Sequence, residues 1–240
     1  MVQASSRKFQ YILLLLICVC SLIYGFSPWV KDHKRLLLEI FKPLTMCLVI
    51  IYAFSLRLYC ESKSYFIIIV VGLLFSITGD ELLLYHHFVP GLASFLLAHV
   101  CYCIAFFPKK RPFNFKFYPL LFWIAFFVLF FVFILPHVDK KLKAPVICYA
   151  SVLSLMCNFS TEQFLKYRNK STLIAVIGAI LFATSDVILS VNMFITSFKG
   201  YLLVNEITYI GGQLGIVTSL NFALNNKVYG KNSEMYLELV

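Results

Sequence analysis

Charged residues are scarce in this chain: they make up 13% of its 240 residues, whereas soluble proteins carry about a quarter. Apolar residues account for 61% and aromatic residues for 17%, which is more than one water-soluble domain of this length could bury. This composition excludes a disordered chain, a secreted disulfide scaffold and a soluble nucleic-acid-binding protein. The sequence instead predicts a polytopic membrane protein.

Three common catalytic motifs are also missing. The sequence contains no GxSxG nucleophile elbow, so a lipase-type serine mechanism has no support. The HExxH zinc motif and the phosphate-binding P-loop are absent as well. Cysteine is present, but seven of the eight cysteines fall in apolar runs, where cysteine behaves as a small apolar residue. We therefore predict packing rather than metal ligation for them.

Long apolar runs bounded by charged residues, Pro or Gly predict eight membrane-spanning helices. Eight spans of about 20 residues would use about 160 positions, which the apolar content allows. Strand-type alternation is absent and the runs are too long for barrel strands, so an all-α helical bundle is favoured. The predicted spans cover about residues 10–26, 36–56, 65–86, 91–107, 117–136, 144–160, 172–191 and 200–224.

No stretch outside these spans is long enough for a second domain, so residues 1–226 are predicted to form one transmembrane domain, followed by a polar tail over 227–240. Eight spans place both termini on one side of the membrane. That side carries 13 Lys and Arg residues and the other side seven, which predicts cytosolic termini and a cytosolic tail. Loop cations near anionic lipid headgroups account for the net charge of +10 without a nucleic-acid partner.

The third and seventh predicted spans share a short repeat. At a constant offset of 106 residues, the aligned pairs are Gly72 with Gly178, Thr78 with Thr184 and Asp80 with Asp186. The same offset relates His99 in the fourth span to Asn205 in the eighth. Both spans run in the same direction, which indicates a parallel four-plus-four repeat. One aspartate of each half would then face its counterpart across a pseudo-twofold axis.

Only six of the 32 charged side chains lie inside the predicted spans, namely Glu39, Lys42, Asp80, Glu81, Asp186 and Glu206. A charge inside a spanning helix costs at least roughly 2.5–3.5 kcal/mol unless it is paired or hydrated, so these residues indicate either function or structural ion pairs. Glu81 points about 100° away from Asp80 around the helix. We expect the two aspartates, rather than Glu81 and Glu206, to be functional.

Several of the polar groups share a depth in the membrane. At about 1.5 Å per residue, five of them lie roughly 8–14 Å beneath the non-cytosolic boundary: Lys42, Asp80, His99, Asp186 and Tyr209. Helical spacing adds Tyr102, three residues after His99, and a stripe formed by Asn205, Tyr209 and Gln213. A common depth predicts a common cavity.

Two carboxylates close together in a low-dielectric cavity do not both ionise, so one serves as an acid and the other as a base. That pairing suits cleavage of an acid-labile C–O bond through an oxocarbenium-like state. Lys42 would hold a phosphate or keep one aspartate ionised, and His99 would move a proton. Spacing alone leaves three alternatives open: a lipid hydrolase, a proton-coupled membrane carrier or lipid transporter, and a structural membrane partner protein.

Motifs in several spans resemble the YhhN-type lysoplasmalogenase family. The resemblance covers about residues 36–222, and the matching residues are Lys42-Pro43, Gly79-Asp80, Phe88-Val89-x-Gly91-Leu92, Phe95, His99, Tyr102, Ser185-Asp186-x5-Asn192-x-Phe194 and Thr208-Tyr209-x3-Gln213. The family has eight spans, as predicted here.

The resemblance implies hydrolysis of the vinyl ether bond of lysoplasmalogens drawn from the bilayer, without a metal or an organic cofactor, in the endoplasmic reticulum membrane. Asp80 and Asp186 would be the acid and the base, assisted by His99 and Tyr209. The remaining matched polar residues would bind the substrate: Lys42, Tyr102, Asn192 and Gln213, together with Asn205 from the stripe.

Overall fold

The computed structural model describes residues 2–30, 33–60, 62–107 and 117–221, and these ranges contain eight α-helices and no β-strand. The helices are α1 (Val2–Phe26), α2 (Lys34–Ser55), α3 (Lys63–Leu84), α4 (Phe88–Phe106), α5 (Phe117–Ile134), α6 (Lys140–Tyr167), α7 (Lys170–Phe194) and α8 (Tyr201–Thr218). The predicted all-α bundle is therefore confirmed. The predicted tail over 227–240 lies outside the described residues.

Seven of the eight helices, α1 to α7, are long and apolar enough to cross a membrane. The eighth, α8, has 18 residues, and three of these are the polar residues Asn205, Glu206 and Gln213. Glu206 and Gln213 are fully buried, so α8 places its polar side chains inside the bundle.

Two helices extend well beyond the spans predicted from hydropathy. The helix α1 begins at Val2 rather than near residue 10, and α6 runs for 28 residues to Tyr167 rather than from 144 to 160. A helix of 28 residues is about 42 Å long, which exceeds a hydrocarbon core of about 30 Å. The polar ends of these helices carry no helix-breaking residue, and α6 stops only where Arg168 takes a left-handed conformation with φ 47°.

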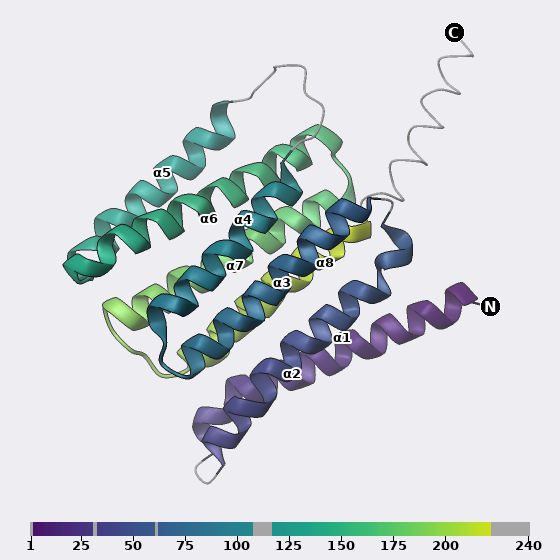
Figure 1. The fold of residues 1–240 in the computed structure, drawn as a ribbon, viewed down its shortest axis with the longest axis horizontal. Helices are drawn as coiled ribbons and strands as arrows, with labels where there is room; N and C mark the ends of the chain where they lie inside the picture. Colours follow the sequence, from purple (N-terminus) through teal and green to yellow (C-terminus); the bar gives the residue numbers. More distant parts are fainter. Residues whose placement is uncertain (1, 31–32, 61, 108–116, 222–240) are drawn as a thin grey trace.

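The helices α3, α4, α7 and α8 occupy the centre of the bundle, with α1 and α2 on one flank and α5 and α6 on the other (Figure 1). Large apolar side chains cover the outer surfaces of the flanking helices. Leu15 on α1 is 65% exposed and Leu121 on α5 is 63% exposed. Such exposure is unfavourable in water but normal for side chains that face lipid.

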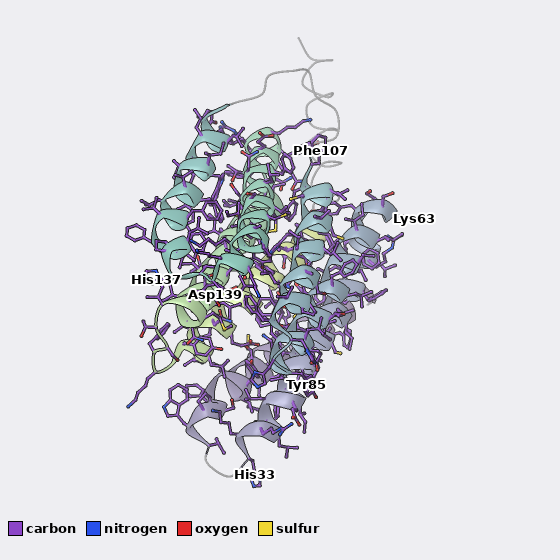
Figure 2. The ribbon with its side chains drawn as sticks, turned by 60° about the vertical axis from the view of Figure 1, so that its left-hand side comes forward. His33, Lys63, Tyr85, Phe107, His137 and Asp139 are labelled. Atoms are coloured by element: carbon purple, nitrogen blue, oxygen red, sulfur yellow. The ribbon has the colours of Figure 1, made fainter. Side chains whose placement is uncertain are left out.

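A tight turn joins α3 to α4 and reverses the chain direction. Figure 2 shows Lys63, at the start of α3, and Phe107, just after α4, toward one end of the molecule and Tyr85 toward the other. The turn uses a left-handed conformation at His86, with φ 64°. Asp80, four residues before the end of α3, thus lies near the Tyr85 end of the bundle.

Glycines allow α7 and α8 to approach each other closely. A Cβ atom on Gly178 would lie 2.8 Å from the Cα atom of Gly215 and 2.8 Å from the backbone nitrogen of Ile216. Neither of these backbone atoms can move without shifting α8. The glycines therefore set the distance between two helices that carry Asp186 and Tyr209.

The substitution Gly178→Ala is expected to lower the apparent melting temperature in detergent, because overpacking of this kind costs about 1–3 kcal/mol. Gly211→Ala is the matched control. Its Cβ would meet only the flexible end of Leu181, at 3.2 Å, so it should leave the melting temperature within error of the unmodified protein. Equal melting temperatures for both variants would contradict the close backbone contact.

Candidate active site

A buried lysine connects three helices of the bundle. The Nζ atom of Lys42 on α2 lies 2.7 Å from Oε2 of Glu206 on α8 and 3.2 Å from Oδ1 of Asp80 on α3. All three side chains are 8% exposed or less. One cation thus faces two carboxylates inside the bundle.

Hydrogen bonds extend this arrangement toward α4. The hydroxyl of Tyr209 donates to Oδ2 of Asp80 at 2.8 Å, and Nε2 of Gln213 donates to the Tyr209 hydroxyl at 3.3 Å. The hydroxyl of Tyr102 donates to Oε1 of Gln213 at 2.9 Å. We call Lys42, Asp80, Tyr102, Glu206, Tyr209 and Gln213 the lysine cluster.

Two aromatic rings complete the surroundings of the lysine ammonium group. The Lys42 Nζ atom lies 4.2 Å from the ring centroid of Tyr209 and 5.0 Å from that of Tyr24 on α1, at cation–π distance. Together with the two carboxylates, these rings enclose the ammonium group. Of the two roles expected for Lys42, the arrangement favours pairing with Asp80 over contact with a substrate phosphate.

A second group of polar side chains surrounds Asp186 on α7. The hydroxyl of Tyr149 on α6 donates to Oδ2 of Asp186 at 2.9 Å. The Nε2 atom of His99 on α4 lies 2.9 Å from the Tyr149 hydroxyl and 3.4 Å from Oδ2 of Asp186. We call His99, Tyr149 and Asp186 the histidine cluster.

Aromatic rings lie between the two clusters. The Phe182 ring centroid lies 4.8 Å from that of His99 and 5.3 Å from that of Tyr209, and the Phe95 ring centroid lies 6.0 Å from that of Tyr209. Each aspartate has its own partners, and within the described part of the chain no hydrogen bond or ion pair joins the two. The aspartates therefore form two sites rather than a dyad in direct contact.

The two clusters are nevertheless built alike. Asp80 on α3 is contacted from α2 and α8, and Asp186 on α7 is contacted from α6 and α4. Each half of the chain thus supplies its last helix to the aspartate of the other half. Such an exchange is expected of two parallel repeats around a pseudo-twofold axis.

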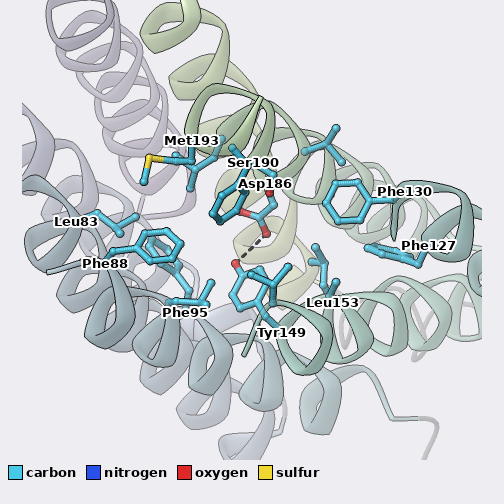
Figure 3. Close-up of a pocket in the computed structure, with 16 residues that line it drawn as sticks. Leu83, Phe88, Phe95, Phe127, Phe130, Tyr149, Leu153, Asp186, Ser190 and Met193 are labelled. Atoms are coloured by element: carbon cyan, nitrogen blue, oxygen red, sulfur yellow. Dashed lines mark hydrogen bonds between the residues drawn. The ribbon is translucent and has the colours of Figure 1, made fainter. Parts of the chain in front are cut away.

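An apolar pocket opens beside Asp186 (Figure 3). It encloses about 600 Å³, counting the part open to the outside, between α3, α4, α5, α6 and α7. Its lining is mostly Leu, Val, Met and Phe, and the polar groups are the carboxylate of Asp186 and the hydroxyls of Tyr149 and Ser190. Asp186 is 13% exposed, whereas the side chain of Asp80 is 5% exposed, so Asp186 is the aspartate that a ligand in this pocket would reach.

The nine residues predicted as a site are divided by this arrangement. Asp186 lines the pocket, and His99 contacts Asp186. Five residues belong to the lysine cluster, namely Lys42, Asp80, Tyr102, Tyr209 and Gln213. Asn192 and Asn205 are partly exposed and belong to neither cluster. The common depth predicted one shared cavity, whereas the structure has a pocket beside Asp186 and a separate ion-paired cluster around Lys42.

Sequence reasoning missed Tyr149 and ranked Glu206 below the aspartates. A tyrosine is uninformative by itself in a chain with 14 of them, since tyrosine also serves as an apolar packing residue. Glu206 was recognisable as a charge inside a predicted span. Lys42 is also a charge inside a span, and such a charge is costly unless it has a partner of opposite charge.

The fold and the two clusters define a polytopic helical membrane protein in which a group of polar side chains opens on an apolar pocket. A model of the YhhN family matches residues 37–220, so the chain belongs to the YhhN family, the family of lysoplasmalogenases. The match includes every residue of both clusters and leaves out α1, which carries Tyr24. No curated protein and no solved structure was found to match the chain.

Proposed function

We propose that this protein hydrolyses the vinyl ether bond of lysoplasmalogens, which are 1-alkenyl-glycerophosphocholine and 1-alkenyl-glycerophosphoethanolamine. The products are a fatty aldehyde and glycerophosphocholine or glycerophosphoethanolamine. The observation that carries the proposal is a carboxylate, Asp186, on the wall of an apolar pocket in a member of the YhhN family. An apolar pocket with a few converging polar groups is what a single-chain lipid with one reactive bond requires.

Cleavage begins with proton transfer to carbon. Protonated Asp186 donates its proton to the β-carbon of the vinyl ether, and the ether oxygen then shares the positive charge of an oxocarbenium ion. The Asp186 carboxylate stabilises this cation and accepts a proton from the water that attacks the cationic carbon. The resulting hemiacetal collapses, its hydroxyl proton passes to the departing glycerol oxygen, and the aldehyde is released. One water is consumed, and Asp186 ends protonated again.

The other members of the histidine cluster orient Asp186 and move protons. The Tyr149 hydroxyl holds one oxygen of the carboxylate, and the His99 Nε2 atom lies within reach of both groups. Asp80 does not contact the substrate in this scheme, because it is paired with Lys42 and does not line the pocket. The lysine cluster then supports α2, α3 and α8 around the reaction site.

The fold and the family support a proposal for the location of the enzyme. Seven helices long and apolar enough to cross a membrane support a pocket within the bilayer, where a lysolipid substrate would reach it. We propose the endoplasmic reticulum membrane, with both termini in the cytosol. The pocket then lies toward the non-cytosolic ends of the helices, since Leu83, Phe88 and Phe194 of its lining lie at helix ends on that side.

Hydrolysis in D2O tests the chemical step. Purified protein incubated with a lysoplasmalogen in D2O should give an aldehyde carrying one deuterium at carbon 2, because the β-carbon of the vinyl ether takes a proton from a solvent-exchanged acid. Immediate reduction of the aldehyde to the alcohol prevents later exchange. Release of a phosphorylated headgroup instead would show cleavage of the phosphodiester and contradict the proposal.

The substitution Tyr149→Phe should lower kcat by about 10²-fold with little change in KM, because the carboxylate loses the group that orients it. Tyr65→Phe is the matched control. The Tyr65 hydroxyl is also buried and bonded, to Ser219 at 2.6 Å, but it lies outside both clusters. An equal loss of kcat in the two variants would mean that Tyr149 contributes only to stability.

A further inference from the structure

The pocket has two arms, one on each side of the Asp186 and Tyr149 pair (Figure 3). The first arm is lined by Leu83, Phe88 and Met193. These residues lie at the end of α3, the start of α4 and the end of α7. The first arm therefore reaches the boundary where the helices end.

The second arm runs between α5 and α6, on the side of Asp186 opposite to the first arm (Figure 3). Asp186 itself lies eight residues before the end of α7, at about 12 Å along the helix. Phe127 lies seven residues before the end of α5, and Leu153 lies 13 residues after the start of α6, which correspond to depths of about 10 Å and 20 Å along the helices. Phe130, one turn after Phe127, and Ala150, one turn before Leu153, also line the pocket. All four side chains are apolar, and Phe127, Ala150 and Leu153 are 3% exposed or less.

This layout matches a lipid whose reactive bond lies between its headgroup and its hydrocarbon chain. We propose that the second arm binds the hydrocarbon chain of the substrate, and that Phe127 and Phe130 form the wall that sets the accepted chain length. The inference rests on the proposed function for the identity of the substrate. The first arm then leads from the reactive bond to the boundary where the helices end, and the polar part of the lysolipid lies beyond it, in the headgroup region of the membrane.

One contact within α5 and one between α5 and α6 hold the wall in place. The rings of Phe127 and Phe130 pack edge to face, with centroids 6.2 Å apart. One turn earlier on α5, the indole nitrogen of Trp123 donates to Oγ1 of Thr161 on α6 at 3.1 Å. A wall fixed in this way discriminates by length, because each methylene group that finds apolar room changes affinity by roughly fourfold.

Two variants of the second arm should shift chain-length preference in opposite directions. Ala150→Leu fills the arm, so the chain length with the highest kcat/KM should become shorter. Phe127→Ala opens the wall, so that chain length should become longer. The measurement is aldehyde release from a series of 1-alkenyl lysophospholipids that differ only in chain length, with each lost methylene group costing roughly fourfold.

Neighbouring residues that face away from the arm provide matched controls. Ser151→Leu adds the same side chain at the next position of α6, where the residue is exposed, and Phe133→Ala removes a ring that is 63% exposed on α5. Both controls should keep the preference of the unmodified protein. Identical chain-length profiles in all four variants would overturn the inference, and so would equal shifts in variants and controls.

Binding without turnover separates this inference from the proposed function. The chain has two tryptophans, Trp29 and Trp123, so a Trp29→Phe background leaves Trp123 as the sole reporter at the wall. Non-hydrolysable 1-alkyl lysolipids brominated at the chain end should quench Trp123 most at the preferred length, and Ala150→Leu should move that length. A length-dependent quench without hydrolysis of any vinyl ether would refute the proposed function alone, whereas hydrolysis with length-independent quenching would refute the chain site alone.

Discussion

Replacement of Asp186 by Asn should abolish most of the aldehyde release, with kcat falling roughly 10²–10⁴-fold, the usual contribution of a general acid or base. The asparagine keeps the shape of the side chain and still accepts the hydrogen bond that Tyr149 donates, but it has no proton to give to carbon. Folding and binding of a 1-alkyl lysolipid should persist. Initial rates at saturating lysoplasmalogen measure the loss.

The corresponding substitution Asp80→Asn is the matched comparison for Asp186→Asn, because both aspartates accept a tyrosine hydroxyl. Asp80 does not line the pocket, so its loss should lower kcat far less than the loss of Asp186. Equal losses in the two variants would contradict the proposal that Asp186 alone gives and accepts the protons of the reaction. They would instead support an acid and base acting together, as the sequence alone suggested.

Removal of the buried lysine charge should have the largest effect on stability. In Lys42→Met, the carboxyl groups of Asp80 and Glu206 remain buried without their cation. Loss of one partner from a buried ion pair costs about 3–5 kcal/mol. The apparent melting temperature in detergent should therefore drop well below that of the unmodified protein, and thermal unfolding followed by size-exclusion chromatography measures the change.

Two further variants show whether this loss arises from charge. Lys34→Met removes an exposed lysine from the same helix and should leave the melting temperature unchanged. The double variant Lys42→Met with Glu206→Gln removes one cation and one carboxylate, so it should recover part of the stability lost by Lys42→Met. A double variant less stable than Lys42→Met would contradict a pairing of these two charges.

Seven of the eight helices, α1 to α7, were predictable because each carries a long apolar run, and hydropathy alone reports such runs. The ends were not, since α6 continues through the polar residues Asn158, Glu162 and Gln163, which are buried. Hydropathy treats a polar residue as a sign that a span ends. It does not register that a polar side chain can face the interior of the bundle.

The participants in the two clusters were also largely visible in the sequence, because charges inside apolar runs are few and costly. Their grouping was not visible. Depth along a helix places Asp80 and Asp186 in one layer, but it gives no rotation of one helix relative to another. The rings of Phe95 and Phe182, which separate the clusters, belong to apolar runs in which no single phenylalanine stands out.

The central claim is that this membrane protein cleaves a vinyl ether. The direct test is to incubate purified protein in detergent with a lysoplasmalogen and, separately, with the matching 1-acyl lysolipid, and to measure released aldehyde and fatty acid. We predict aldehyde from the vinyl ether, release slower by at least about 10²-fold in Asp186→Asn, and no fatty acid from the acyl lipid. No aldehyde from well-folded protein would contradict the claim and favour a proton-coupled carrier that uses the same buried acids.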